Sequence, residues 1–154
     1  MARRTAAALV VLVSVPLIAL VLGMRWKLPA VLDVVRRLNK SVTNPRTMRS
    51  AGTAGAHTSV IEHVGRTSGR RYRTPVDVVP IESGFLVALP YGTRADWLRN
   101  VLAAGSATVI TDGRRLPVAS PTVVATAEVA RLIPPKTMRT LKLFGVSECL
   151  RLQC

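Results

Sequence analysis

The segment 58–100 constrains the fold of this chain more than any other part of the sequence. Two short apolar runs, at 58–64 and 72–80, flank a turn that is rich in glycine and arginine. Apolar runs bounded by turn residues are typical of a β-hairpin. A third run at 85–89 leads through a loop to a helix predicted over 95–104. The segment therefore predicts antiparallel strands followed by a helical connection.

The next part of the chain continues the strand pattern. Gly105 suits the end of the helix, because glycine adopts the left-handed backbone conformation at little cost. Strands are predicted at 106–111 and 114–125, joined by the hairpin dipeptide Asp112-Gly113. Two prolines within the second of these strands mark it as an edge strand or a bulged strand.

The C-terminal part adds helices and a last strand. Thr126 is placed to cap a helix over 127–133, and two consecutive prolines interrupt that helix. A basic helix then runs to about Leu143, and a strand is predicted at 148–152. About six short, mostly antiparallel strands with peripheral helices predict an α+β, mainly β fold, a small and partly closed β-barrel.

The N-terminus carries a continuous apolar run at 6–23, with two arginines before it and Trp26 after it. An 18-residue helix is about 27 Å long, close to the thickness of a hydrocarbon core. We expect a membrane anchor, and the surplus of cations after the run places the following domain at the cytoplasmic face of the cell membrane. A secretory signal, a helix that lies on the membrane and a start-site artefact are the alternatives.

The segment 29–40 is predicted to be an amphipathic helix, and residues 41–57 a polar linker. The helix would either pack on its own domain or lie along the inner leaflet. The expected organisation has three parts: an anchor-like helix at 1–27, an amphipathic helix and linker at 28–57, and the barrel domain at 58–154.

The net charge favours an anionic partner. Lys and Arg number 22 against 8 acidic residues, which gives a formal charge of +14. Aromatic residues make up only 4% of the chain, too few for the base-stacking surfaces of single-strand nucleic-acid binders, so no nucleic-acid partner is expected.

Several kinds of catalytic motif are missing from the sequence. It has no Rossmann or Walker A fingerprint, no GxSxG elbow, and no pair of acidic residues at a catalytic spacing. Two histidines and two cysteines show no spacing that predicts a metal site. An enzyme of this sequence would therefore depend on a cofactor for its chemistry.

The arginine-rich turn at 65–74 contains two glycines, four arginines and three Ser or Thr hydroxyls. Glycines let backbone N–H groups approach a phosphate, hydroxyls donate hydrogen bonds to it, and guanidinium groups pair with its oxygens. The turn predicts a phosphate-binding loop, with a solvated hairpin loop as the alternative. A second loop, at 90–94, precedes a helix whose N-terminus would attract an anion. In the alternative interpretation Trp97 and Leu98 only anchor that helix in the core.

Together the two motifs resemble the actinobacterial family of deazaflavin-dependent nitroreductases and quinone reductases. The matching segments are HVGRTSGRRYRTPVDVV (63–79), FLVALPYGTRADWLRNVLAAGSATV (85–109) and LKLFGVSECLRL (141–152). The resemblance implies a split β-barrel that binds coenzyme F(420), a deazaflavin with a phosphodiester and a polyglutamate tail. It also implies hydride transfer from the reduced cofactor to a quinone or a nitro-type acceptor.

The resemblance and the turn chemistry together define the predicted cofactor-binding residues: Arg66, Thr67, Ser68, Gly69, Arg71, Arg73, Thr74, Leu89, Pro90, Tyr91, Gly92, Thr93, Asp96, Trp97, Arg99 and Asn100. Tyr91 is the candidate proton donor. Rival interpretations are a related barrel that binds FMN or haem, a non-catalytic deazaflavin-binding protein at the membrane, and a nucleic-acid-binding protein, which only the charge suggests. The acceptor and a homodimeric state are left open.

Overall fold

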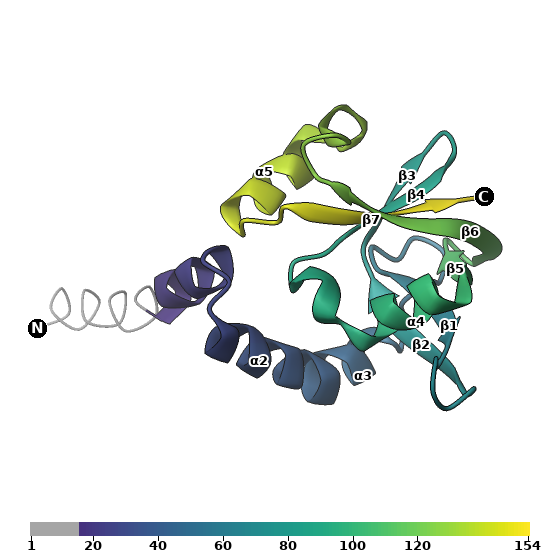
Figure 1. Ribbon diagram of the computed structural model, residues 1–154, viewed down its shortest axis with the longest axis horizontal. Coiled ribbons are helices and arrows are strands. Elements are labelled where there is room, and N and C mark those ends of the chain that lie inside the picture. Colours follow the sequence, from purple (N-terminus) through teal and green to yellow (C-terminus); the bar gives the residue numbers. More distant parts are fainter. Residues whose placement is uncertain (1–15) are drawn as a thin grey trace, which may run out of the picture.

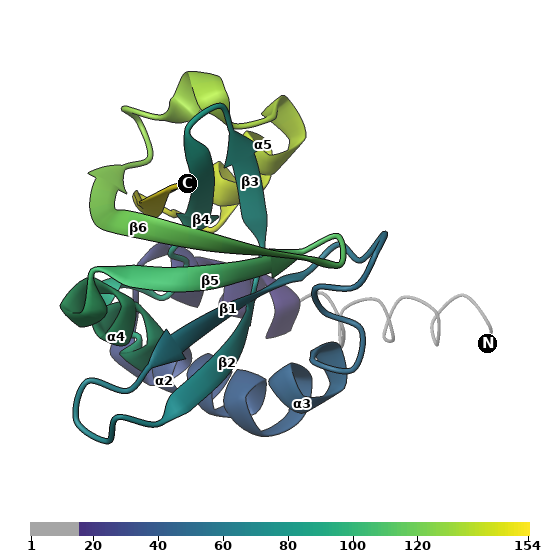
Figure 2. The ribbon, with the colours of Figure 1, turned by 90° about the vertical axis from the view of Figure 1, so that its right-hand side faces the viewer.

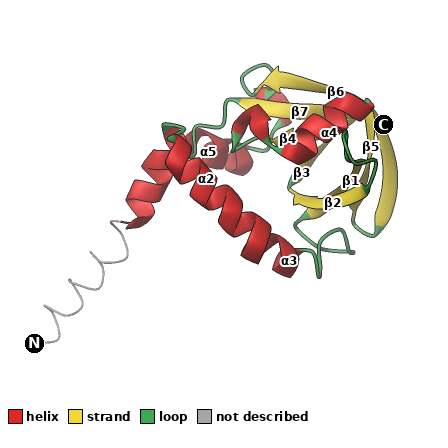
Figure 3. Cartoon of the chain, turned by 60° about the horizontal axis from the view of Figure 1, so that its bottom comes forward, coloured by secondary structure: helices red, strands yellow, loops and turns green. Residues whose placement is uncertain are grey.

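The computed structural model describes residues 16–154, and its centre is one antiparallel sheet of seven strands. The strands are β1 (Ser59–Val64), β2 (Arg71–Val76), β3 (Val78–Ile81), β4 (Gly84–Ala88), β5 (Ser106–Thr111), β6 (Arg114–Ala125) and β7 (Glu148–Gln153). Their order across the sheet is β2-β1-β5-β6-β7-β4-β3. The sheet curls into a half-barrel, so the chain has the α+β split-barrel fold that its sequence predicts (Figure 3).

Helices surround this sheet and form an arm beside it (Figure 1). The described part of the first helix covers residues 16–25. It is followed by α2 (Pro29–Leu38), the π-helical segment η1 (Asn39–Thr43), α3 (Asn44–Thr47), η2 (Gly92–Arg94), α4 (Asp96–Ala104), η3 (Ala130–Leu132) and α5 (Pro135–Leu143).

The main core lies inside the curl, between the sheet and α4. Inward side chains of the strands, such as Ile61, Val109 and Leu150, are fully buried together with Leu98 and Val101 of α4. Burial of each such side chain stabilises the fold by roughly 1.5–3 kcal/mol. Helix α4 is therefore held against the inner side of β1, which brings its N-terminus near the β1–β2 turn (Figure 2).

Two smaller clusters cover parts of the outer side of the sheet. Helix α5 and the segment before it pack on Leu86 of β4 and Cys149 of β7. Met48 and Ala51 pack on Val60 of β1 and its neighbour in β5. The rest of the outer face of β1 and β5 has no helix over it.

The sequence located most turns correctly. Gly105 ends α4 with φ 68°, and the β5–β6 turn has positive φ at both Asp112 (50°) and Gly113 (72°), as a tight hairpin requires. The predicted irregularity in the long strand is a register shift between Ala119 and Thr122.

Three predictions about local structure were wrong. The strand expected at 72–80 is two strands, β2 and β3, separated at Asp77, which allows the chain to leave one edge of the sheet and enter the other. No α-helix forms over 127–133, where turns and the short η3 occur, and the Thr126 hydroxyl contacts the Cys149 thiol at 3.5 Å. The helical arm extends to residue 47, because η1 and α3 continue α2 into the region expected to be a linker.

The predicted membrane anchor at 6–23 lies largely outside the described residues. Within residues 16–154, no helix has the length and apolar character needed to cross a membrane. The α2 stripe of the predicted amphipathic helix is divided: Leu32 is buried, whereas Val34 and Leu38 are more than half exposed.

Candidate functional site

The two motifs that stood out in the sequence meet in the structure. Arg66, at the start of the β1–β2 turn, extends to the first turns of α4. Its guanidinium donates to a carboxylate oxygen of Asp96 at 3.1 Å and to the Oδ1 atom of Asn100 at 2.9 Å. The backbone N–H of Arg66 donates to the same Asn100 oxygen at 3.2 Å. With a longer bond from the guanidinium to the Asp96 carbonyl, at 3.5 Å, four hydrogen bonds tie the turn to the first turns of α4.

Asn100 extends this connection into the interior. Its amide nitrogen lies 3.3 Å from Nδ1 of His63, and Nε2 of His63 lies 3.2 Å from the Thr74 hydroxyl. Asn100 and His63 are 7% and 6% exposed, and burial lowers the pKa of His63. The His63 ring also stacks on Tyr72, with ring centroids 5.8 Å apart. These contacts form one polar network across β1, β2 and α4, which is buried at His63 and Asn100 and exposed at Tyr72.

The shape of the turn depends on its two glycines. A Cβ atom at Gly65 would lie 2.4 Å from the Ser68 hydroxyl oxygen and 2.7 Å from the Tyr72 ring, so a side chain does not fit there. Gly69 has φ 64° and open space around it. Ser68 and Tyr72 exchange a hydroxyl–hydroxyl hydrogen bond of 3.1 Å. The turn is thus a compact loop with Thr67 and Gly69 at its exposed surface.

The structure does not bring all the predicted arginines to one side. Side chains alternate along β2, so Arg71 and Arg73 point away from Tyr72 and Thr74. They pair in register with Val64 and Glu62, on the outer face of the sheet. Arg66 instead lies with the inner network. The single phosphate cradle predicted from the sequence is therefore two groups of residues, one on each face of the hairpin.

The outer face carries a groove of about 700 Å³ across β1, β5 and β6, lined in part by Arg71 and Arg115. Arg115 makes a close ionic contact of 2.6 Å with Glu62, without hydrogen-bond geometry at that carboxylate oxygen. Arg71 is the only residue of the predicted cofactor set that lines this groove.

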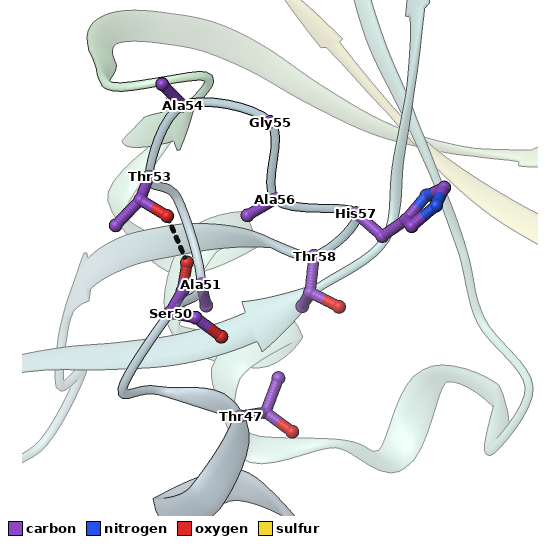
Figure 4. A pocket seen from close by; sticks show the side chains of 9 residues that line it. All are labelled: Thr47, Ser50, Ala51, Thr53, Ala54, Gly55, Ala56, His57 and Thr58. Atoms are coloured by element: carbon purple, nitrogen blue, oxygen red, sulfur yellow. Dashed lines mark hydrogen bonds between the residues drawn. The ribbon is translucent and has the colours of Figure 1, made fainter.

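A second hollow, of about 380 Å³, lies in the loop at 47–58 (Figure 4). Threonine and serine hydroxyls line it, but the loop uses its own polar groups: the Thr53 hydroxyl donates to the Ser50 carbonyl at 2.7 Å. The Gly55 N–H donates to the side chain of Asp112 at 3.0 Å, which holds the loop on the β5–β6 turn. We interpret this hollow as part of a structural loop.

The second predicted loop lies between β4 and α4, and its residues divide into core and surface. Leu89 is 4% exposed and belongs to the main core, so its side chain is not available to a ligand. Trp97 packs partly against that core. Thr93 and Arg99 are exposed, and Pro90 and Gly92 are half-buried.

Tyr91 is the most distinctive side chain of this loop. Its hydroxyl accepts a hydrogen bond from the side-chain amide of Asn39 in η1. Burial raises the pKa of Tyr91, and the negative charge of Asp77 acts in the same direction, whereas the bond from Asn39 opposes them. The phenol is therefore protonated at neutral pH. Because Asn39 supplies the donor, the phenol hydrogen is available for another acceptor.

The sequence did not indicate three residues that make these contacts: His63 and Tyr72 in the network behind the turn, and Asn39 beside Tyr91. Because side chains alternate between the two faces of a strand, the sequence of β1 and β2 could have placed His63 and Tyr72 on the inward face with Ile61. Nothing in the sequence indicates the partnership of Asn39 with Tyr91, which lies 52 positions away.

No known protein family matches the sequence, and no curated protein is significantly similar to it. Among solved structures, the fold is similar to the Agrobacterium tumefaciens protein Atu2129, of unknown function (19% identity, TM-score 0.44); the match covers 64% of this chain and 48% of that protein. This chain thus spans about half the length of Atu2129. An F(420)-H2 dependent reductase (16%, TM-score 0.43) matches over 63% of this chain and 94% of its own. HutZ, a haem storage protein from Vibrio cholerae (14%, TM-score 0.43), matches over 64% and 82%. We draw no functional conclusion from similarities of this size.

Proposed function

We propose that this chain is a deazaflavin-dependent oxidoreductase that uses reduced coenzyme F(420) to reduce a quinone or a nitro-type acceptor. One observation carries the proposal: the two separate motifs on which the sequence resemblance depends form one unit, in which Arg66 is bound to both Asp96 and Asn100. The proposal also uses the exposed arginines of the same hairpin: Arg70 in the turn, and Arg71 and Arg73 on the opposite face from Arg66.

The charges around this unit suit a polyanionic cofactor. Arg70, Arg71 and Arg73 are exposed, and none of them takes part in the three ion pairs formed within residues 16–154. Free guanidinium groups pair with phosphate and carboxylate oxygens through charge-assisted hydrogen bonds. The exposed Thr67 and Gly69 at the tip leave room for close approach of a phosphate. The residues therefore fit an anionic phosphodiester and polyglutamate tail.

In the proposed reaction the cofactor, when bound, supplies a hydride. Arg71, Arg73 and the turn from Arg66 to Gly69 hold the anionic part of the cofactor, with Arg66 fixed in place by α4. Tyr91 holds a proton on its phenol oxygen and donates it to the acceptor oxygen, while Asn39 keeps the ring oriented. A hydride and a proton together complete the two-electron reduction of a quinone.

We further propose that the protein works at the cytoplasmic face of a membrane, where a lipid-dissolved quinone is available. Exposed apolar side chains on the helical arm support this location, among them Leu17 and Ile18 (58% and 56% exposed) and Trp26 (66%). Exposed cations, Arg25 and Lys27, lie beside Trp26. Co-sedimentation of the full chain with vesicles of anionic phospholipid tests the proposal, and a chain that stays in the supernatant contradicts it.

The central experiment is a titration of the full-length chain with coenzyme F(420), followed by the fluorescence of the deazaflavin. We expect binding at micromolar concentration that weakens as salt is added, since exposed charges are screened. No binding at this concentration would overturn the proposal. Absorbance after addition of FMN or haem tests whether the chain instead binds one of these cofactors. If F(420) binds but no quinone or nitroaromatic oxidises its reduced form, the chain is a non-catalytic carrier.

Tyr91→Phe tests the proton donor. We expect the rate of acceptor reduction to fall by about 100-fold, because a positioned general acid contributes roughly that much, while the affinity for F(420) stays the same. Tyr72→Phe is the comparison: it removes the only other tyrosine hydroxyl of the chain and its bond to Ser68 in the turn, and it should leave the rate at saturating F(420) unchanged. Because the pKa of Tyr91 is raised, wild-type activity above neutral pH should decline only at strongly alkaline pH, when the phenol ionises. An unchanged rate in Tyr91→Phe would exclude this role.

A further inference from the structure

The buried network behind the β1–β2 turn leaves only one hydrogen-bonding pattern for His63. The Oδ1 atom of Asn100 lies within reach of two N–H donors of Arg66, at 3.2 and 2.9 Å. Neither of these donors can act as an acceptor. The Asn100 oxygen must therefore face Arg66, and its NH2 group must face His63.

The orientation of Asn100 determines the proton position on His63. The Asn100 NH2 group donates to Nδ1 of His63 over 3.3 Å, so Nδ1 carries a lone pair and no proton. The neutral ring then has its proton on Nε2, which donates to the Thr74 hydroxyl at 3.2 Å. This pattern satisfies every polar atom of the His63 side chain.

Protonation of His63 is incompatible with this pattern. A proton on Nδ1 would face the two hydrogens of the Asn100 amide. Asn100 could rotate its amide to present oxygen to His63, but its NH2 group would then face both N–H donors of Arg66. Either the contact between His63 and Asn100 or the contact between Asn100 and Arg66 would be lost.

The ionisable groups around His63 do not offer a compensating negative charge. On its own face lie the Tyr72 ring of β2 and Arg66 of the turn, and Asp96 of α4 is already paired with Arg66. Glu62, Arg71 and Arg73 lie on the opposite face of the hairpin. Strand β5 contains no ionisable residue.

We propose that His63 is a positioning residue of the cofactor site: its neutral form holds Asn100 in the orientation that fixes Arg66 and the tip of the turn, and protonation of its ring releases them. The effect on the cofactor rests on the proposed function, whereas the effect on the turn does not. The site would then bind the cofactor more tightly at neutral pH, where His63 is neutral, than at mildly acidic pH.

The direction of the pH dependence follows from the environment of the ring. Burial lowers the pKa of His63 from its ordinary value of 6.5. The unfolded chain therefore binds a proton at a higher pH than the folded chain. The contribution of His63 to stability is complete above pH 6.5 and is lost progressively as the pH falls below that value toward the folded-state pKa.

Two experiments on the full-length chain test the proposal without any cofactor. Nitrogen NMR of the imidazoles, with His57→Gln to leave a single histidine, should show a proton on Nε2 of His63 at neutral pH. Thermal unfolding should show wild type and His57→Gln losing stability below about pH 6.5, the ordinary histidine pKa. His63→Asn, whose amide oxygen can replace the Nδ1 acceptor without titrating, should lose less.

A cofactor titration adds the functional test. F(420) affinity should fall as the pH is lowered below about 6.5 in wild type and His57→Gln, and should fall less in His63→Asn. A proton on Nδ1 at neutral pH, or equal pH dependence in His63→Asn and wild type, would overturn the proposal. If no variant binds F(420) at any pH, the proposed function fails, but the NMR and unfolding results still decide the role of His63.

Discussion

The β1–β2 hairpin has two faces that carry different kinds of polar chemistry. The inner face holds His63, Tyr72 and Thr74, which are connected to one another and to α4. The outer face holds Glu62, Arg71 and Arg73 beside a wide groove, and its two arginines form no ion pair with any described residue. Both sets come from the same 13-residue stretch of sequence, 62–74, and alternate along each strand.

The difference separates precise positioning from electrostatic attraction. A buried hydrogen bond depends on its partners, because an unpaired polar group in the interior costs about 1–3 kcal/mol. An exposed arginine contributes little to stability but attracts anions over a distance set by the salt concentration. Mutations on the inner face should therefore act mainly through folding, and mutations on the outer face mainly through ligand binding.

The largest effect is expected for Asn100→Ala. This change removes the acceptor for two N–H groups of Arg66 and the donor to His63. We expect the free energy of unfolding to fall by about 3 kcal/mol, since buried groups lose their partners. Urea unfolding measures this loss. Arg99→Ala, at the adjacent exposed position of α4, is the control and should change stability by less than about 0.5 kcal/mol. Equal effects of the two changes would mean that the network does not stabilise the fold.

Gly65→Ala should have the next largest effect. A Cβ atom at this position meets the Ser68 oxygen at 2.4 Å and the Tyr72 ring at 2.7 Å, so the turn must deform. Overpacking of this kind costs typically 1–3 kcal/mol, and we expect about 2 kcal/mol. Gly69→Ala is a matched control, because Gly69 has positive φ but nothing near its Cβ position. Thermal unfolding should show a smaller loss for Gly69→Ala, and a larger one would place the strain in the backbone instead.

The sequence predicted the strands and turns of this fold well because their signals are local. Asp112-Gly113 and Gly105 each require a left-handed backbone, which only a few residue types adopt readily. The break at Asp77 was missed although Pro75, Asp77 and Pro80 are residues that strands disfavour, because the valines between them continue the apolar pattern. The chain leaves one sheet edge here because β2 pairs with β1 whereas β3 pairs with β4. The residues around Asp77 do not by themselves indicate these pairings.

The sequence predicted the two segments that form the candidate site, but not that their arginines lie on opposite faces of the hairpin. The composition of the turn indicated an anion site, and the spacing indicated a helix start at Asp96. The placement of Arg71 and Arg73 on the opposite face from Arg66 required the register of β1 with β2, where Glu62 pairs with Arg73. The contact of Asn39 with Tyr91 depends on where the arm lies, which no pattern in the sequence specifies.

The Arg71→Ala/Arg73→Ala double variant tests the outer face as an electrostatic surface. We expect F(420) affinity to fall at least tenfold, about 1.4 kcal/mol, because two charge-assisted contacts are removed. The salt dependence of binding should become shallower in the same titration. Stability should change by less than about 0.5 kcal/mol, since both side chains are exposed. The double variant Arg131→Ala/Arg139→Ala, at exposed positions outside the hairpin, removes the same two charges and is the control. An equal loss of affinity in this control would mean that the total charge matters and the hairpin does not.

The smallest effect is expected for the ion pair of Arg115 with Glu62, which lies on the outer face but is partly buried. The side chains are 59% and 19% exposed, and the charged groups are 2.6 Å apart. Solvent screening on the Arg115 side should limit the coupling to less than about 1 kcal/mol, the usual range for exposed pairs. A double-mutant cycle with Arg115→Ala and Glu62→Gln, measured by urea unfolding, gives this coupling free energy directly. A coupling free energy above about 2 kcal/mol would mean that this ion pair on the outer face also stabilises the hairpin, as the buried contacts of Asn100 do.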